Sequence, residues 1–305
     1  MQSLDELNRR FAIAGIAEIV SGQGNLPKIH VQTSAAEAEI YLHGAHVTAW
    51  HPAGAEEVIF VSKQAQFEDG RAIRGGIPVC FPWFRAMAGN AKAPAHGFVR
   101  TKAWQLDSIN QKGSDVVVTL STESDEKTRQ WWPYEFRLEH RITVGVDLKL
   151  ELIATNTGST SLRFEEALHT YHRVGDVRKI RVTGLDGVTF LDNTNANREE
   201  TQSGDVVMTK PLDNAYLNTG STLGLDDPSM NRRIQIAKGN SLTTVVWNPW
   251  ESGARAMADL GDDEWQEFAC VEASNILSGA VDLAAGQEHV MTAEIGVRSG
   301  SEHTA

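Results

Sequence analysis

Residues 162–176, LRFEEALHTYHRVGD, hold two adjacent carboxylates and two histidines. Side chains of these types could bind a metal, cleave a glycosidic bond or transfer protons. The segment lies between strand-like stretches and has a β-type composition, so we interpret it as extended chain. Successive side chains of a strand point to opposite faces. This alternation bears on each of the three kinds of chemistry.

Metal binding is not supported by the spacing of the histidines. His169 and His172 are three residues apart and diverge on a strand, and His43 and His46 fail for the same reason. No third or fourth ligand stands at a suitable spacing, and neither cysteine belongs to a CxxC motif. We therefore expect no metal site.

Hydrolysis is not supported either, which leaves proton transfer. Glu165 and Glu166 are adjacent and cannot flank one glycosidic bond from opposite faces of a strand. His169 has a side chain that can give or take a proton near neutral pH. On the residues alone, the favoured interpretation is a core histidine satisfied by one hydrogen bond. We interpret His172 as a surface or shell residue.

The overall charge limits the classes of partner. The 305 residues include 28 basic and 40 acidic side chains, for a net charge of -12. An acidic chain gains nothing from counterion release, so we expect no nucleic-acid partner. It also lacks a basic patch for a membrane surface, a spanning segment and a secretory signal, so we expect a soluble, cytoplasmic protein. Cys80 and Cys270 lie in apolar runs typical of buried thiols, although a bridge between them stays open.

Short strands dominate the expected secondary structure. Residues 3–12 favour a helix with Ser3 as N-cap and Glu6 completing a capping box. Strand-like segments follow at 28–34, 38–43, 46–50, 57–62, 115–123, 136–145, 147–158, 178–185, 188–194, 232–239, 242–249, 268–275 and 289–297. With no linker or repeat, we expect one all-β domain over residues 1–305, an antiparallel sandwich or barrel. The longest stretch without strand character, about residues 66–100, is rich in Gly and Pro and is a candidate functional loop.

Six segments, in order, resemble the hexose-6-phosphate mutarotase (glucose-6-phosphate 1-epimerase) branch of the aldose 1-epimerase superfamily. They are RGGIPVCFPWF at 74–84, AHGFVR at 95–100, FEEALHTY at 164–171, VTGLDG at 182–187, VVWNPW at 245–250 and CVEASN at 270–275. The resemblance implies a large antiparallel β-sandwich of the galactose-mutarotase type. It also implies interconversion of the α and β anomers of a sugar, without metal or organic cofactor.

The resemblance implies roles for six residues. It makes Glu272 the base that takes the proton of the C1 hydroxyl, and His169 the acid that protonates the ring oxygen. The residues that it places against the sugar or its phosphate are Arg74, His96, Arg100 and Asp213. The chain departs from the family at Ala95, where some members carry Gln, and at His172, where an aromatic residue is common.

The expected substrate is a hexose 6-phosphate, glucose 6-phosphate above all. The chain is acidic overall, yet the loop gathers Arg74, Arg85, Lys92 and Arg100, and the fork of an arginine suits phosphate. For Arg85 we expect pairing with a surface carboxylate instead. The alternatives are an aldose 1-epimerase for an unphosphorylated sugar, a non-catalytic carbohydrate-binding protein and a regulatory binder of a phosphorylated metabolite. One or two of the motif aromatics, Trp83, Phe84, Trp247 and Trp250, are expected to contact the sugar.

Overall fold

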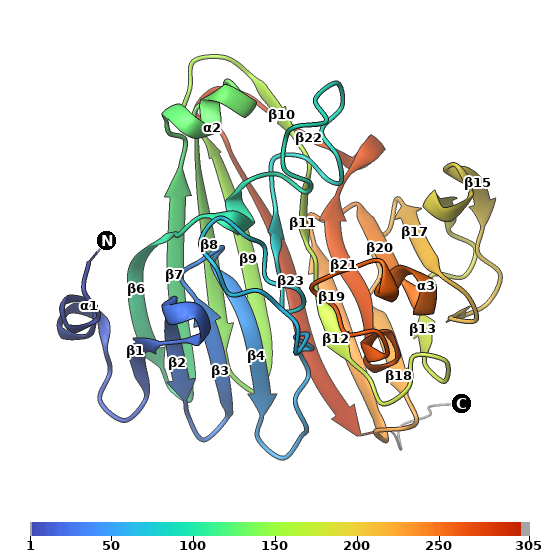
Figure 1. Ribbon diagram of the computed structural model, residues 1–305, viewed down its shortest axis with the longest axis horizontal. Coiled ribbons are helices and arrows are strands. Elements are labelled where there is room, and N and C mark those ends of the chain that lie inside the picture. Colours follow the sequence, from blue (N-terminus) through green and yellow to red (C-terminus); the bar gives the residue numbers. More distant parts are fainter. Residues whose placement is uncertain (1, 300–305) are drawn as a thin grey trace.

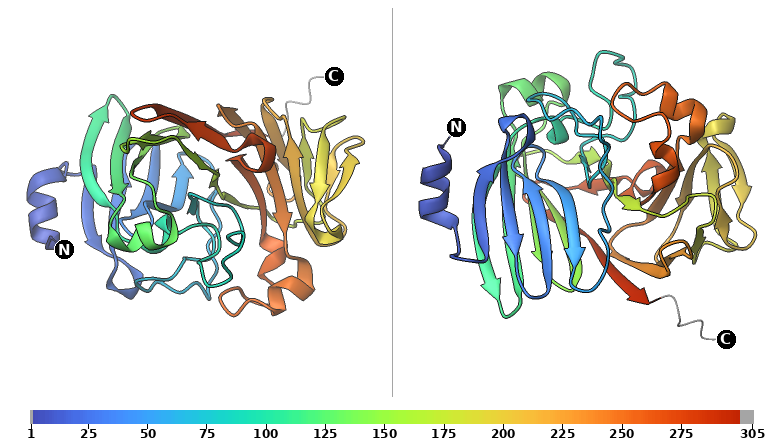
Figure 2. Two further views of the ribbon diagram at one scale, coloured as in Figure 1. Left: turned by 90° about the horizontal axis from the view of Figure 1, so that it is seen from above. Right: turned by 60° about the horizontal axis from the view of Figure 1, so that its bottom comes forward.

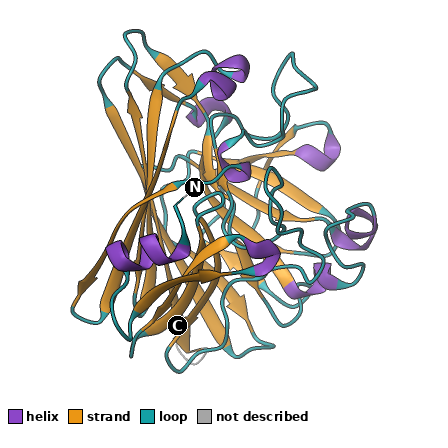
Figure 3. Cartoon of the chain, turned by 60° about the vertical axis from the view of Figure 1, so that its left-hand side comes forward, coloured by secondary structure: helices purple, strands orange, loops and turns teal. Residues whose placement is uncertain are grey.

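The computed structural model describes residues 2–299 and consists mainly of antiparallel strands in packed layers (Figure 1). Helices are short and lie outside the strand layers (Figure 3). They are α1 (Leu4–Phe11), α2 (Glu126–Trp131) and α3 (Trp250–Arg255), with 3₁₀ turns η1 (Gln23–Asn25), η2 (Val99–Thr101), η3 (Asn193–Asn195), η4 (Glu264–Glu267) and η5 (Leu277–Gly279). This confirms the all-β expectation.

The first helix forms where its capping residues predict it. Ser3 Oγ accepts the backbone N–H of Glu6 at 3.3 Å, and the Glu6 carboxylate accepts the backbone N–H of Ser3 at 2.9 Å. Leu7 and Phe11 then face the core one turn apart. Among residues 2–299, no helix is long and apolar enough to cross a membrane.

The largest sheet has nine strands and forms one wall of the molecule. In spatial order they are β16 (Val206–Val207), β13 (Arg181–Thr183), β18 (Leu223–Asp227), β19 (Arg232–Gly239), β23 (Glu288–Ser299), β9 (Asp147–Asn156), β8 (Phe136–Val144), β7 (Asp115–Glu123) and β6 (Gln105–Lys112). Seen from above, the long strand β23 connects the blue and green strands with the orange and yellow ones (Figure 2). It does so by pairing with β9 on one side and β19 on the other.

An eight-stranded sheet carries the candidate site. Its order is β15 (Arg198–Thr201), β14 (Thr189–Asp192), β17 (Leu212–Leu217), β20 (Thr243–Asn248), β21 (Phe268–Asn275), β11 (Glu166–Leu168) and β5 (Val79–Cys80), and β12 (Tyr171–Arg173) also pairs with β21. All eight residues of β21 are buried. A polar side chain on this strand is therefore held away from solvent, and this burial shifts its pKa, as described below for Glu272.

Two smaller sheets complete the fold. One is the N-terminal set β1 (Ala17–Ser21), β2 (Pro27–Gln32), β3 (Ala36–Tyr41) and β4 (His46–Pro52), and the other pairs β10 (Leu162–Phe164) with β22 (Val281–Leu283). Trp50 on β4 is fully buried, and its indole N–H donates to the carbonyl of Gly145 at 3.2 Å, in the turn between β8 and β9. A large cluster of buried apolar side chains extends from Leu7 to Ile295. This continuity supports the proposal that residues 1–305 form one domain.

The loop expected at 66–100 is irregular apart from β5 and η2, and two glycines shape it. Gly75 has φ +100°, and a Cβ there would lie 2.5 Å from the carbonyl oxygen of Phe60. Gly97 has φ +73°, and a Cβ there would lie 1.8 Å from the carbonyl oxygen of Phe81. Only glycine fits these close backbone approaches. They hold the backbone of the neighbouring residues, Arg74 and His96, in place.

The strand expected at 57–62 is not formed as such. This segment makes only isolated bridges, Ile59 with His172 and Val61 with Gly75. Its neighbours are the three-residue β12, which pairs with β21 on its other side, and the irregular loop. A β-rich composition cannot produce a regular strand where no long partner lies alongside.

Candidate active site

Cross-strand pairing lines up polar and aromatic side chains on one face of the eight-stranded sheet. Asp213 on β17 lies opposite Trp247 on β20, Trp247 lies opposite Cys270 on β21, and Cys270 lies opposite Tyr171 on β12. Glu272 follows Cys270 by two residues on the same strand and therefore faces the same side. The register of the sheet, rather than proximity in sequence, assembles these groups.

His169 stands against Glu272 in the centre of this face. It lies between β11 and β12, where its backbone N–H donates to the carbonyl of Pro78 at 3.0 Å. Nδ1 of His169 is 3.3 Å from Oε1 of Glu272, and the two side chains are 9% and 0% exposed. The imidazole stacks on Tyr171 with ring centroids 4.9 Å apart and meets the edge of Trp247 at 5.8 Å. The two rings fix the orientation of the imidazole toward the carboxylate.

Burial drives both members of this pair toward their uncharged forms. It raises the pKa of Glu272 well above its usual value, and the nearby Asp213 acts in the same direction. Burial also lowers the pKa of His169, as does the neighbouring His96. Neither oxygen of Glu272 nor Nδ1 of His169 has a hydrogen-bond partner among the described residues, because the 3.3 Å contact lacks hydrogen-bond geometry. Polar atoms of the two side chains therefore face one another, without other protein partners, in a buried place.

A pocket of about 360 Å³ contains this pair and all six residues that the sequence singles out. Its walls come from the loop 66–100, from the β14–β17 region and from the face of β20 and β21. The lining residues are Arg74, Phe84, Arg85, Ala95, His96, Arg100, His169, Asn193, Asp213, Val245, Trp247, Met257 and Glu272. Carboxylates, imidazoles and guanidinium groups thus meet in one concave place, as in a binding site for a polar small molecule.

The cationic side of the pocket comes from the loop. Arg74 donates from Nε to Asp259 at 3.2 Å and from Nη1 to the hydroxyl of Tyr171 at 3.0 Å. Arg100 donates from Nη2 to the carbonyl of Ala95 at 3.0 Å, while its buried Nε has no partner among the described residues. Burial lowers the pKa of Arg100. An anion in the pocket would offset this desolvation.

Sequence reasoning missed the roles of two polar pocket residues, Arg85 and Asn193. Arg85 was expected to pair with a surface carboxylate, but its partner is Asp213, a pocket residue whose side chain is 19% exposed. Asn193, in η3, donates to the other oxygen of Asp213 at 2.6 Å. The position of Arg85 in the candidate loop was a usable signal. For Asn193 the sequence offered none, because its place follows from the pairing of β14 with β17.

Two of the four motif aromatics line the pocket. Phe84 and Trp247 are among its walls. The indole N–H of Trp83 instead donates to the carbonyl of Pro94 at 2.9 Å, and Trp250 packs on Trp265 with ring centroids 4.4 Å apart. The structure therefore leaves Phe84 and Trp247 as the candidates for sugar contact.

The two histidines of the opening segment diverge, as the strand interpretation predicts. His172 is fully buried, and its Nε2 lies 3.3 Å from the carbonyl oxygen of Val271. The expectation of a surface or shell position for His172 is wrong, because pairing of β12 with the buried strand β21 draws it into the core. Cys80 and Cys270 are free, buried thiols.

The adjacent glutamates also face different partners. Glu165 accepts the backbone N–H of Phe84 at 2.9 Å and of Leu277 at 2.8 Å. Glu166 is fully buried and lies 2.9 Å from Nε2 of His289. The two carboxylates therefore do not flank a common site.

A metal-ligand arrangement does exist, although not at the histidine pairs. One donor atom from each of His169, Cys270 and Glu272 lies within 4.8 Å of the others. Cys270 and Glu272 share a face of β21, but His169 reaches them only through the pairing of β12 with β21, so ligand spacing in the sequence could not reveal the group.

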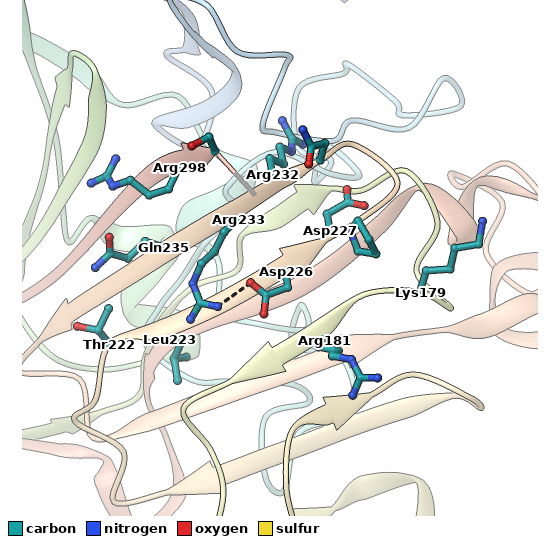
Figure 4. Close-up of a pocket in the computed structure, with 13 residues that line it drawn as sticks. Lys179, Arg181, Thr222, Leu223, Asp226, Asp227, Arg232, Arg233, Gln235 and Arg298 are labelled. Atoms are coloured by element: carbon teal, nitrogen blue, oxygen red, sulfur yellow. Dashed lines mark hydrogen bonds and ion pairs between the residues drawn. The ribbon is translucent and has the colours of Figure 1, made fainter. Parts of the chain in front are cut away.

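A larger cavity, of about 690 Å³, lies on the nine-stranded sheet (Figure 4). The register places Arg181, Asp226, Arg233 and Arg298 in one row across β13, β18, β19 and β23. Within this row Arg233 donates to Asp226 at 2.6 Å, as the dashed line shows. Among the described residues that line this cavity there is no histidine, cysteine or glutamate. The larger cavity does hold Asp226, Asp227 and Lys179, but the buried contact between a histidine and a glutamate lies in the smaller pocket.

Comparison with known proteins identifies the family to which the chain belongs. The sequence profile of the family "Aldose 1-epimerase" matches residues 27–296. A Salmonella typhimurium protein named "Putative glucose-6-phosphate 1-epimerase" is 36% identical over 250 residues, which cover 81% of this chain and 83% of that protein. An Escherichia coli protein of the same name is 37% identical over 238 residues, covering 77% and 79%.

Solved structures show the same fold. The crystal structure of a "putative mutarotase" from Salmonella typhimurium superposes with a TM-score of 0.88 at 31% identity, covering 95% of this chain and 96% of that one. A "galactose mutarotase-like protein" from Clostridium acetobutylicum gives a TM-score of 0.72 at 15% identity, covering 93% and 98%, and so shows the fold alone. The family match and these likenesses show that the chain belongs to the aldose 1-epimerase family.

Proposed function

We propose that this protein interconverts the α and β anomers of a hexose 6-phosphate, with glucose 6-phosphate as the first candidate. The observation that carries the proposal is the buried contact of 3.3 Å between His169 and Glu272 in a pocket bordered by arginines. The names of the relatives from Salmonella typhimurium and Escherichia coli support the same substrate.

The reaction needs one acid and one base, and the pair supplies both. Glu272 takes the proton of the C1 hydroxyl, while His169 gives a proton to the ring oxygen as the C1–O5 bond breaks. The open aldehyde rotates about C1–C2, and O5 attacks the other face of the carbonyl. The two protons then return to O1 and to His169, so that nothing is consumed. Each positioned group contributes roughly 10²–10⁴-fold.

Binding of the sugar favours the ionised Glu272 and the protonated His169 that this mechanism requires. In the ligand-free protein, burial favours a neutral Glu272 and a neutral His169. The ion pair differs from this neutral pair only by one proton moved between the two side chains. A hydroxyl that donates to the bare oxygens of Glu272 stabilises the carboxylate, and the displaced proton then resides on His169.

The arginines make phosphate the favoured substituent. Arg74 and Arg100 both line the pocket, and His96 of the same loop has its imidazole centroid 5.6 Å from that of His169. A phosphate group accepts the two-pronged donation that guanidinium groups offer. These cations provide a local attraction for an anion in a chain whose net charge is -12.

Other residues that line the pocket are suited to the sugar ring. Trp247 offers a flat surface for the apolar face of a pyranose. Asp213, held by Arg85 and Asn193, presents oriented acceptor oxygens for a sugar hydroxyl. Together these groups would position C1 and O5 against the proton-transfer pair.

Exchange NMR spectroscopy on anomers of glucose 6-phosphate and of galactose, with and without the protein, tests the proposal. We expect exchange of the glucose 6-phosphate anomers to accelerate strongly and that of galactose much less. Faster exchange of galactose would favour an aldose 1-epimerase for unphosphorylated sugars. Binding without any acceleration would refute the enzyme and identify a carbohydrate-binding protein.

A further inference from the structure

We propose that His169, Cys270 and Glu272 form a three-ligand site for a divalent cation of the zinc or cadmium type, and that its occupation blocks the pocket's acid–base pair. The binding part of this inference stands on the geometry of the three side chains. The blocking part rests on the proposed function, and the experiment below separates the two.

The distances fit a small tetrahedral cation. One donor atom from each residue lies within 4.8 Å of the other two. For Zn²⁺, nitrogen and oxygen ligands at their usual bond lengths are about 3.4 Å apart in a tetrahedron. Nδ1 of His169 and Oε1 of Glu272 are already 3.3 Å apart. The cation would therefore need little movement of these two ligands.

The donor atoms are also available. Oε1 and Oε2 of Glu272 and Nδ1 of His169 are buried without a hydrogen-bond partner among the described residues. No protein donor occupies these atoms, so they are accessible as ligands to a cation once the carboxyl group is ionised. Cys270, two residues before Glu272 on β21, adds a free thiol on the same face.

The charges of the ligands select the class of cation. A thiolate, a carboxylate and a neutral imidazole together carry a charge of about −2, which neutralises a divalent ion in a buried place. Sulfur and imidazole ligands favour Zn²⁺ or Cd²⁺ over Mg²⁺ or Ca²⁺. The bond between sulfur and metal forms as the Cys270 thiol releases its proton to solvent, so binding is coupled to proton release.

Occupation has a direct consequence for acid–base chemistry. The cation would take the lone pairs of Nδ1 of His169 and of a Glu272 oxygen, so the pair could no longer exchange protons with a sugar. Three protein ligands leave the fourth tetrahedral position for water or a sugar hydroxyl from the pocket. The site is thus inhibitory, and the same activity would not depend on a metal.

Titration of the chelator-treated full-length protein with Cd²⁺ tests binding without reference to activity. We expect one Cd²⁺ per chain by calorimetry, release of at least one proton, and an ultraviolet charge-transfer band from a cadmium thiolate. Cys270→Ala and Cys270→Ser should each abolish the band. Cys80→Ala is the matched control, since Cys80 is the other buried free thiol, and it should keep the band. A band that survives in both Cys270 variants, or is lost in the Cys80 variant, would overturn the site.

Anomer exchange then tests inhibition. With Zn²⁺ at ten times its dissociation constant, about 90% of the sites are filled, so the wild-type rate should fall about tenfold. Each Cys270 variant, compared with its own metal-free rate, should resist this inhibition. Chelation should leave the wild-type rate unchanged, and a rate lost on chelation and restored by metal would overturn the inhibitory role. A wild type that binds Cd²⁺ but never accelerates anomer exchange would refute the proposed function while the metal site stands.

Discussion

Nη2 of Arg85 lies 2.6 Å from Oδ1 of Asp213, and this ion pair forms one wall of the pocket that contains Glu272. The two charges act on Glu272 in opposite directions. Asp213 raises the pKa of Glu272, and Arg85 lowers it. The ion pair therefore tunes the pKa of the proposed base, and it includes Asp213, which we propose accepts a hydrogen bond from a sugar hydroxyl.

Substitutions in this ion pair should move the pH profile in opposite directions. Asp213→Asn removes a negative charge near Glu272 and should shift the alkaline limb of kcat/KM to lower pH. Arg85→Gln removes a positive charge and should shift the same limb to higher pH. The measurement is kcat/KM against pH, which reports the free enzyme. Shifts of the same sign in both variants would contradict this electrostatic coupling, whatever each variant does to the affinity.

The wild-type pH profile should reflect the shifted pKa values of both members of the pair. The pair is active when it holds one proton, and that state is lost only below the lowered pKa of His169 or above the raised pKa of Glu272. The acid limb should therefore lie below pH 6.5. Unphosphorylated glucose is the control substrate, because a phosphate group itself titrates near pH 6. An acid limb centred at or above pH 6.5 with glucose would contradict the lowered histidine pKa.

Removal of either proton-transfer group should abolish most of the rate. His169→Asn and Glu272→Gln are each expected to lower kcat for anomer exchange roughly 10²–10⁴-fold. The double variant should be little slower than either single variant, because groups that act as a unit are not additive. His30→Asn, at a partly exposed histidine on β2, serves as the control and should keep the wild-type rate. Near wild-type exchange in either folded single variant would show that the assignment is wrong.

The sequence was most informative where the alternation of side chains is strict. The segments 115–123, 232–239 and 268–275 are strands with these same bounds, because buried and polar positions alternate or because both faces are buried. The segment 57–62 has the same kind of composition, yet it forms only isolated bridges. A strand needs a partner, and the partner is a property of the tertiary structure that composition does not encode.

The site divides in the same way. The motif segments identify His169 and Glu272, and the structure brings them within 3.3 Å. The pocket positions of Arg85 and Asn193 were not predicted, because loop side chains have no periodicity that predicts their direction. Cys270 was not predicted as a metal ligand, because its proximity to His169 depends on the register between β12 and β21. The sequence shows which residue types are present, whereas the meeting of their side chains in one pocket depends on how the strands pair.

The pocket arginines should discriminate between phosphorylated and free sugar. A charged hydrogen bond contributes about 1.5–3 kcal/mol, so Arg74→Ala or Arg100→Ala should lower kcat/KM for glucose 6-phosphate by roughly one to two orders of magnitude. The values for glucose should change much less. Arg129→Ala, at an exposed arginine on α2, is the matched control. Equal losses on both sugars would show that these arginines do not bind phosphate, and a wild type that prefers free glucose would refute the phosphosugar substrate.

Buried histidines should make the fold sensitive to acid. Burial lowers the pKa of His172 to about 4 from its usual value of 6.5. The unfolded chain therefore binds a proton at pH 5 that the folded chain does not, so the stabilisation present above pH 6.5 is lost as the pH falls toward 4. For His172 the loss between pH 7 and pH 5 is about 2 kcal/mol. Urea titrations at the two pH values measure it as a difference in the free energy of unfolding.

His172→Gln removes the titrating group, so its loss of stability between pH 7 and pH 5 should be smaller than that of the wild type by about 2 kcal/mol. His140, whose pKa burial also lowers to about 4, provides a second variant, His140→Gln, with the same expected sign. If both variants lost as much stability as the wild type over this interval, other groups would have to account for the acid sensitivity.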